Sequence, residues 1–466
     1  MKLSLSQKAK GVLSIISGIL INIVCGSLYS WSGINGYYIS YLRHTDSPTI
    51  EIKDGYFFIP IITFTSMCFS PIVAIINGKK GIKHISLISI FLIFITNIIL
   101  YNSTNVIYVY GCMIFYGIIN SMNYMPVIKN CLFYFPKKKG LINGFILFGY
   151  GTSSLIYNSI ADYLINPSYH QINPDTGFFD FDIAINIIKY LKFFFIFNGI
   201  ISIISYLLLF EYKKTETEKD DKENNLNDFD EKNLKKKETT KSQEKEEEGI
   251  TVKEAFIQAS KGIQLYQLWI MSTVLQTVSF TVINTYRSFA QQCLMEEHLL
   301  SNLTKTYSML NGFSRLIWGY LFDKFSFKCL YSICMITQSI VGSILYNSVR
   351  YPNLFFFLIC FQSLVVSGKI SLNVTMFTKI HGIKYFGLIY SVSTAIGAIC
   401  HLLEPFIIKI FVKKLEDYKI LYIGGSFGAI FCIIILLNFS EEKFKFKNSE
   451  KENENEKELK EISNKP

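Results

Sequence analysis

The chain has 466 residues, of which 50% are apolar and 15% aromatic, while only 18% are charged and the formal net charge is +10. A soluble protein could not keep this much apolar side chain away from water, so the composition excludes that class. Most of the charge lies in two stretches, 211–262 and 441–466, and the remainder reads as long apolar runs divided by short polar breaks. The sequence therefore predicts a polytopic, all-α membrane protein.

The ten cysteines occur singly, without a Cys-x-x-Cys pair, and most of them lie inside apolar runs. They are expected to be small buried side chains that form neither a disulfide framework nor a metal site. Lysine in loops indicates membrane topology and argues against binding to nucleic acid. No ATP-binding motif of the form Gly-x-x-x-x-Gly-Lys-Ser/Thr occurs, so the sequence does not support nucleotide-driven pumping.

A helix needs about 20 apolar residues to cross a hydrocarbon core about 30 Å thick. Runs of this kind predict twelve transmembrane helices in two six-helix bundles. The first six are expected at 11–36, 56–77, 84–101, 106–133, 140–163 and 186–210, and the second six at 264–288, 303–322, 327–348, 354–378, 385–410 and 419–439. The expected division is an N-terminal bundle at 1–212, a charged linker at 213–262, a C-terminal bundle at 263–440 and a tail at 441–466.

The linker and the tail differ from the bundles in composition. Residues 213–249 alternate Lys, Glu, Asp and Asn with almost nothing apolar, and the tail has the same character. Such segments cannot bury enough surface to fold alone, so we expect both to be disordered. The alternative is that either of them carries a regulatory or partner-binding motif.

Lysine and arginine in short loops indicate the orientation, because they are enriched on the cytoplasmic side. With a cytoplasmic N-terminus, thirteen of them fall in inside segments and six in outside loops. Both termini and the linker are therefore predicted to be cytoplasmic, although the loop before the last helix goes against the trend. No leader precedes the first apolar run, so the plasma membrane is the default expectation and an organelle membrane the alternative.

A charged turn follows the eighth predicted helix, with the sequence Gly319-Tyr-Leu-Phe-Asp323-Lys324-Phe-Ser326-Phe-Lys328. One acid and two bases on a short turn can pair across the bundle and latch one conformation. This turn and the six-plus-six layout resemble the major facilitator superfamily, whose signature is Gly-x-x-x-Asp-Arg/Lys-x-Gly-x-Arg/Lys. The resemblance implies a substrate site between the two halves near mid-membrane.

The equivalent turn after the second helix is a candidate for the same conformational motif. It reads Gly78-Lys79-Lys80-Gly81-Ile82-Lys83, so it keeps the glycine and the bases but lacks the acid. That departure weakens the expectation of a symmetric latch.

Three further motifs resemble those of oxalate:formate antiporter-like carriers, which are relatives of the monocarboxylate transporters. They are Gly26-Ser-Leu-Tyr29-Ser-Trp31-Ser32, Tyr124-Met-Pro126 followed by Phe133-Tyr-Phe135-Pro136-Lys-Lys-Lys-Gly140-Leu-Ile-Asn-Gly144, and Asn311-Gly312-Phe-Ser314-Arg315-Leu-Ile-Trp318-Gly319. The chain departs from the family pattern at Tyr134, where the family has Trp, and at Ser314, where it has Gly. The resemblance extends loosely over nearly all of the chain outside the linker and tail.

Arg315 lies about 18 Å into the eighth helix at about 1.5 Å per residue, so its guanidinium is expected deep in the membrane. A charge at that depth costs several kcal/mol, and a planar donor fork fits a carboxylate. The family resemblance implies that this arginine holds the anionic substrate. The alternative is a structural ion pair with a neighbouring helix, or snorkelling to the cytoplasmic face.

The oxalate carriers have a second cation in their eleventh helix, and Ser393 occupies that place here. A substrate with two negative charges would lose its second partner, which favours a monocarboxylate such as pyruvate, lactate or formate. Lys369 in the tenth helix lies close to the depth of Arg315 and is an alternative second cation, which would restore a dicarboxylate. The other reading of Lys369 is a pair with an acid that serves only the bundle.

His401 and Glu404 are three residues apart and therefore share one face of the eleventh helix. A buried histidine and a buried carboxyl are candidates for proton coupling. The alternative is that both lie in the outer third of the membrane, where water reaches them and no relay is needed. Arg287, near the outer end of the seventh helix, is a candidate for their salt-bridge partner.

Aromatic residues in the motifs are candidates for the wall of the substrate site. Tyr29, Trp31, Tyr124 and Tyr150 could line a cavity opposite the arginine, because tyrosine hydroxyls donate to carboxylates and aromatic walls exclude larger polar solutes. Close-packing positions that let the halves rock are expected on the fifth helix at Gly140, Gly144, Gly149 and Gly151.

Together these features predict a secondary transporter of small organic anions, most of all monocarboxylates, that works by alternating access with proton symport or anion exchange. Its partners would be the anion, a proton and the lipid bilayer, and a monomer would suffice. We expect no covalent chemistry, so the protein would not be an enzyme, and no cofactor or metal. The alternatives are a carrier of a dicarboxylate or amino acid that uses Arg315 and Lys369, and a membrane sensor that does not transport.

Overall fold

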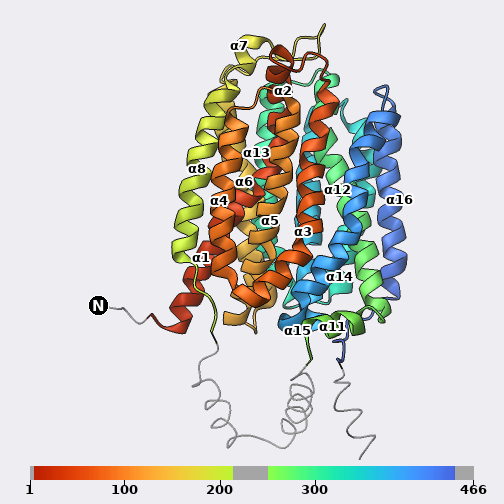
Figure 1. Cartoon of the computed structure of the whole chain (residues 1–466). Helices are drawn as coiled ribbons and strands as arrows, with labels where there is room; N and C mark the ends of the chain where they lie inside the picture. Colours follow the sequence, from red (N-terminus) through yellow and green to blue (C-terminus); the bar gives the residue numbers. More distant parts are fainter. Residues whose placement is uncertain (1–4, 214–249, 447–466) are drawn as a thin grey trace, which may run out of the picture.

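The computed structural model describes residues 5–213 and 250–446, and every regular element in those ranges is a helix. Long helices run side by side between two ends of the molecule (Figure 1). The start of the first helix, helix α11 (Val252–Ala259) and the end of the last helix all lie at one of these ends, which we call the terminal face (Figure 1). The other end is called the far face.

Six long crossings make up the N-terminal half. The first consists of α1 (Gln7–Cys25), the 3₁₀ turn η1 (Gly26–Ser30) and α2 (Trp31–His44) in succession. The other five are α3 (Phe58–Lys80), α4 (Ile82–Tyr101), α5 (Val106–Tyr134), α6 (Lys139–Ile165) and α8 (Ile187–Leu208). Two short elements belong to the connections at the far face, η2 (Ile52–Phe57) and α7 (Phe181–Ala184).

The C-terminal half contains α12 (Ile263–Gln292), α13 (Glu297–Phe322), α14 (Phe327–Ser348), α15 (Pro352–Phe411) and α16 (Asp417–Leu437). The 60-residue α15 holds two crossings, because Gly382 divides it with φ 73° and ψ 159°. That backbone conformation is left-handed and suits glycine alone among common residues. The half therefore has six crossings, and the predicted fold of twelve transmembrane helices in two six-helix bundles is confirmed.

By length and composition, nine helical stretches in the described ranges are apolar enough to span a membrane, and α15 counts as one of them. The crossings α6 and α13 are not among the nine. Glycine, serine and asparagine occupy much of their buried faces, which lowers their mean hydropathy. These two helices face each other across the two halves, where small residues serve close packing better than large apolar ones.

Glycines line the contact between α6 and α13. A Cβ atom on Gly140 would meet the backbone oxygen of Gly319 at under 3.0 Å, and one on Gly151 would meet the backbone of Gly312 as closely. A Cβ on Gly144 would lie 2.7 Å from the carbonyl oxygen of Arg315. The two backbones therefore touch along most of this interface, and only glycine permits it.

Gly149 faces α1, whereas the other predicted packing glycines of α6 face α13. The backbone oxygen of Ile19 on α1 lies against it, inside the N-terminal half. This glycine therefore packs helices within one half.

Part of the range predicted as a disordered linker is ordered. Helix α11 (Val252–Ala259) begins with a capping box between Thr251 and Glu254 and packs on α15 at the terminal face. A capping box satisfies backbone N–H groups that a short helix otherwise leaves unpaired. Residues 214–249 lie outside the described ranges.

The first residues of the predicted disordered tail are also packed against the C-terminal half. The backbone N–H of Phe444 donates to the carbonyl of Ile380 at 3.0 Å, beside the break in α15. Partial burial disfavours the charged form of Glu441, but the backbone N–H of Lys328 and the ammonium of Lys379 outweigh it and lower the pKa of that carboxyl. The tail is therefore anchored as far as 446, and 447–466 lie outside the described ranges.

Candidate functional site

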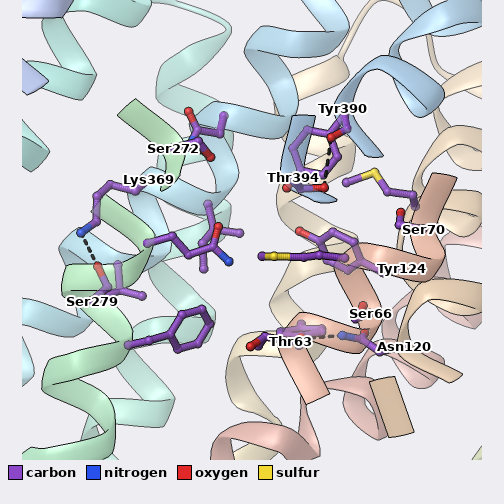
Figure 2. Close-up of a pocket in the computed structure, with 18 of the residues that line it drawn as sticks. Thr63, Ser66, Ser70, Asn120, Tyr124, Ser272, Ser279, Lys369, Tyr390 and Thr394 are labelled. Carbon is purple, nitrogen blue, oxygen red and sulfur yellow. Dashed lines mark hydrogen bonds between the residues drawn. The ribbon is translucent and has the colours of Figure 1, made fainter. Parts of the chain in front are cut away.

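A central cavity of about 90 Å³ lies between the two halves (Figure 2). An engineered cavity of roughly 150 Å³ accommodates benzene, so this one suits a solute of a few heavy atoms. From the N-terminal half it is lined by Tyr29, Thr63, Ser66, Met67, Ser70, Asn120, Tyr124, Met125 and Tyr150, and from the C-terminal half by Ser272, Gln276, Ser279, Phe280, Ile283, Val366, Lys369, Ile370, Asn373, Tyr390 and Thr394.

Two polar stripes form much of this lining. On α3 the stripe consists of Thr63, Ser66 and Ser70, and on α12 of Ser272, Gln276 and Ser279. Spacings of three, four and seven residues place each stripe on one face of its helix. The sequence analysis did not identify these residues, although polar side chains at helical spacing inside apolar runs are a signal that could have found them.

Lys369 is the charged residue among the described residues that line the cavity. It is 3% exposed, and its Nζ donates to Ser279 Oγ, to Gln338 Oε1 at 2.9 Å and to the carbonyl of Leu275 at 3.3 Å. Figure 2 shows the ammonium against Ser279, on the side of the cavity opposite Tyr124. All three acceptors are neutral, so the described residues within salt-bridge distance supply no negative charge to this cation.

Arg315 is fully buried directly behind the cavity wall, not on it. Its Nε donates to Asn311 Oδ1 at 3.1 Å and its Nη1 to the carbonyl of Leu147 at 3.3 Å, while Nη2 has no hydrogen-bond acceptor among the described residues. The guanidinium carbon lies 5.4 Å from the centre of the ring of Tyr150, which lines the cavity. An ion pair with a neighbouring helix, the structural alternative for this residue, is not formed in the described part of the chain.

Three predicted tyrosines meet at the cavity. Tyr150 packs edge to face against both Tyr29 and Tyr124, with ring centres 5.5 Å apart in each pair. Asn120 donates to the Tyr150 hydroxyl at 3.3 Å. On the other side Tyr29 stacks on Phe280 of α12, so the aromatic cluster bridges the two halves.

Two predicted substrate ligands lie away from the central cavity. Trp31 is inside the N-terminal half, stacked on Tyr38 and packed edge to face against Phe58 and Phe194. Ser393 donates to the carbonyl of Ile389 and lines a separate small cavity of about 10 Å³. Both helices are placed as expected, but their rotation turns these side chains elsewhere.

His401 and Glu404 are both buried, so this conformation does not show the water access that the alternative interpretation expected. His401 lines the same small cavity as Ser393, and its ring packs edge to face against Phe280 at 5.3 Å. Glu404 accepts a hydrogen bond from Asn284 at 3.1 Å, and its second oxygen has no partner among the described residues. Arg287 is not their partner, because it pairs with Glu297 at the start of α13.

Replacement of Arg287 by methionine is expected to lower the midpoint of thermal unfolding in detergent by several degrees. Removing one partner of a buried ion pair costs about 3–5 kcal/mol, because the other charge is left unpaired. The double variant Arg287→Met/Glu297→Met should recover most of the loss. Lys379→Met, which breaks the more exposed pair with Glu441, is the control and should cost about 1 kcal/mol or less. Equal losses in both single variants would contradict the prediction.

Ion pairs join the halves at the far face. Lys305 Nζ lies 2.8 Å from Asp162 Oδ2, and Lys409 Nζ lies 2.8 Å from Asp54 Oδ1. The Tyr37 hydroxyl also reaches Glu297 at 3.4 Å. Each contact links an N-terminal residue to a C-terminal one, so the far side of the cavity is held closed by charge.

Asp323 of the charged turn closes the terminal face. Its two carboxylate oxygens accept from the backbone N–H groups of Gly140 and Leu141 at 3.1 and 3.2 Å, at the N-terminus of α6 in the other half. A carboxylate at a helix N-terminus is favoured by the unpaired N–H groups and by the helix dipole. The Asp323 carboxylate therefore holds the two halves together through hydrogen bonds from backbone N–H groups, and we call this contact the latch.

The bases of the predicted motif do not take part in that latch. Lys324 lies over the ring of Tyr320 at 4.4 Å, and Lys328 Nζ donates to the carbonyl of Leu437, both within the C-terminal half. In the turn after α3, Gly81 has φ 80° and separates α3 from α4, while Lys80 is exposed. The turn after α13 therefore links the two halves through Asp323, whereas the turn after α3, which lacks the acid, connects α3 with α4.

Replacement of Asp323 by alanine is expected to weaken closure of the terminal face by about 1 kcal/mol, which is roughly a fivefold shift toward the state open at that face. The readout is the rate at which a membrane-impermeant maleimide labels a cysteine placed at Ser70, followed by mass spectrometry. Lys324→Ala, on the same turn but outside the latch, is the control. A faster rate in the control, or an unchanged rate in Asp323→Ala, would contradict the role of the latch.

The sequence and the fold of this chain are similar to those of known membrane transporters. Residues 268–466 match the family model described as Major Facilitator Superfamily, which is less than half of the chain. An uncharacterized MFS-type transporter of Escherichia coli, YhjX, is 25% identical over 154 residues, which are 33% of this chain and 37% of that protein. The chain thus matches little more than a third of this curated relative's length.

Solved structures share the fold over almost the whole chain. Two structures of a bacterial homologue of the iron transporter ferroportin, both outward-facing and one soaked with iron, have TM-scores of 0.60 and 0.61. They cover 92% of this chain and 98% of their own, at 9% and 10% identity. The chain therefore has the major facilitator fold in a multi-pass membrane protein. The family-model match and the similarity to YhjX support a membrane transporter of that type.

Proposed function

We propose that this protein is a secondary transporter of small organic monocarboxylates, and that it works by alternating access to the central cavity. The observation that carries the proposal is the ammonium of Lys369, which is buried on the cavity wall with only neutral hydrogen-bond partners. A small anion in the cavity would supply the missing charge.

Other cations with little access to water have acidic partners. The buried Arg287 pairs with Glu297 and the half-buried Lys305 pairs with Asp162, as expected where an unpaired buried charge is costly. Lys369 and Arg315 have no carboxylate within salt-bridge distance among the described residues. Two such cations near one cavity give it a positive potential that attracts an anion.

The size and lining of the cavity favour a short carboxylate. A volume of about 90 Å³ suits pyruvate, lactate or formate better than a sugar. The hydroxyls of Tyr124 and Tyr390 and the amide of Asn120 offer hydrogen bonds on the side of the cavity opposite Lys369. A metal cation is disfavoured, because the described lining residues include an ammonium and no carboxylate.

A dicarboxylate is the second candidate, and Arg315 is the reason for it. Its Nη2 lacks an acceptor among the described residues, and the guanidinium lies beside the ring of Tyr150, which lines the cavity. A rotation of Tyr150 would expose two cations to one substrate. With Tyr150 in its present position one cation lines the wall, which favours a single negative charge.

Transport would proceed by rocking of the halves along the glycine-lined contact of α6 with α13. The ion pairs of the far face and the Asp323 latch of the terminal face would break alternately. His401, which lines the small cavity next to the central one, and Glu404, which is buried on the same helix, are the groups we propose for proton coupling. The predicted orientation makes the terminal face cytoplasmic.

The test is uptake of radiolabelled pyruvate, lactate, formate and oxalate into proteoliposomes, with and without an inward proton gradient. The control is protein-free liposomes. Uptake of a monocarboxylate supports the proposal, and its dependence on the gradient separates symport from exchange. Uptake of oxalate alone would select the dicarboxylate. No uptake of any of the four would overturn the proposal, and binding to the purified protein without uptake would then indicate a sensor.

A further inference from the structure

A second and larger cavity, of about 400 Å³, opens between the halves at the terminal face. Its walls come from the end of α3, from α5, from α15 beyond the break at Gly382, and from the linker helix α11. We call it the vestibule. Nothing in the preceding proposal uses it.

Three lysines line the vestibule, namely Lys79, Lys129 and Lys253, and no Asp or Glu is among its described lining residues. Lys129 is half-buried, and its Nζ donates to the carbonyl of Lys384 in the other half at 3.0 Å. Lys79 and Lys253 are exposed. Like charges brought together without an acid repel one another, and an anion among them relieves that repulsion.

The vestibule and the central cavity are neighbours. Ser70 and Met125 line both of them. Ser70 Oγ lies 2.7 Å from Ser391 Oγ across the two halves, so a hydrogen bond between hydroxyls lies at the boundary. A solute leaving the central cavity toward the terminal face would pass this contact and arrive beside Lys129.

We propose that the vestibule is a second binding site for the transported carboxylate, occupied before or after the anion passes between Ser70 and Ser391. The three ammonium groups hold the carboxylate, and the apolar walls, among them Pro126 and Leu388, accommodate its organic part. The proposal rests on the proposed function, since both sites take the same class of ligand.

The linker takes part in this site and is not only a tether. Helix α11 contributes Lys253 to the vestibule. The carbonyl of Ile250, just before α11, accepts from Lys384 Nζ at 3.3 Å and from the Tyr385 hydroxyl at 3.4 Å. Helix α11 is thereby fixed beside the break in α15, with its lysine at the vestibule.

The experiment measures equilibrium binding of radiolabelled pyruvate and lactate to the purified full-length protein, with the number of molecules bound per chain as readout. The vestibule variant is Lys79→Gln/Lys129→Gln/Lys253→Gln, and the central variant is Lys369→Gln. A charge-matched control replaces three exposed lysines outside both cavities, Lys8→Gln/Lys137→Gln/Lys138→Gln. Each protein is measured at low and at high salt.

We expect the wild type and the charge-matched control to bind about two molecules per chain, and each of the other two variants about one. The site left in the central variant should weaken at high salt, because exposed charges are screened more than buried ones. The site that remains in the vestibule variant shows that this variant is folded.

Two results would overturn the vestibule and leave the proposed function standing. One is that the wild type binds about one molecule per chain and that, among the variants, only Lys369→Gln loses it. The other is loss of the second molecule in the charge-matched control as well. A wild type that binds neither carboxylate would instead overturn the proposed function and the vestibule with it.

Discussion

Replacement of Lys369 by glutamine is expected to lower carboxylate uptake by about 100-fold. Loss of a charge-assisted contact in a desolvated site costs about 3 kcal/mol, and each 1.4 kcal/mol or so is a factor of about ten. Glutamine can keep hydrogen bonds to Ser279 and Leu275, so the helices should stay in place. The measurement is the initial rate of pyruvate uptake into proteoliposomes at equal protein content.

The matched control for this prediction is Lys192→Gln. Lys192 is an exposed lysine on α8 that lines neither cavity, so its loss changes the net charge equally without touching the site. Uptake by this variant should equal that of the wild type. If Lys369→Gln transports as fast as Lys192→Gln, the ammonium does not hold the substrate, and the carboxylate assignment loses its main support.

Replacement of Gly140 by valine is expected to abolish transport while each half keeps its fold. A Cβ at this position would meet the backbone oxygen of Gly319 at under 3.0 Å and Asp323 Oδ1 at 2.9 Å. Backbone cannot move aside as a flexible side chain can, so α6 and α13 must separate at the terminal face. The protein should therefore favour the state open at that face, and maleimide should label a cysteine at Ser70 faster.

Gly424→Val is the matched control for this second prediction. Gly424 lies on α16, and a Cβ there would have no heavy atom within 4 Å. This variant should transport and label like the wild type, although it carries the same change of side chain in a membrane helix. Normal uptake in Gly140→Val, or the same loss in both variants, would show that the close contact of α6 with α13 is not needed for rocking.

The two predictions separate binding from movement. Lys369→Gln should leave the labelling rate at position 70 unchanged, since it alters neither latch, whereas Gly140→Val should change it. A loss of uptake with an unchanged labelling rate therefore indicates that substrate binding at the central cavity is impaired. A loss of uptake with faster labelling indicates that the contact between the halves is impaired.

The sequence predicted the twelve crossings well, because the apolar length that a helix needs to span a membrane is a local property. The run 354–378 and the run 385–410 became one continuous element with a break at Gly382, which the short polar gap between them already indicated. The linker was predicted less well. Its average composition hides the segment around Thr251, where a capping box starts a helix.

The candidate site could be predicted only in part. Lys369 and three of the four predicted aromatic residues line the cavity, since a cation or a motif tyrosine inside an apolar run is visible in the sequence. Trp31 and Ser393 do not, although each is only a few residues from one that does. One residue along a helix turns the side chain by about 100°, so the rotation of the helix decides which one faces the cavity.

Arg315 shows most clearly how far the site could be predicted from the sequence. The sequence by itself predicted a guanidinium well inside a membrane-spanning helix, because hydrophobic length indicates where a helix crosses. Only the tertiary structure decided that it lies beside the Tyr150 ring while Lys369 is on the cavity wall, that Arg287 pairs with Glu297, and that Asp323 reaches the N-terminus of α6. These are contacts between residues far apart in the chain, and the packing of the two halves sets them, not any local pattern.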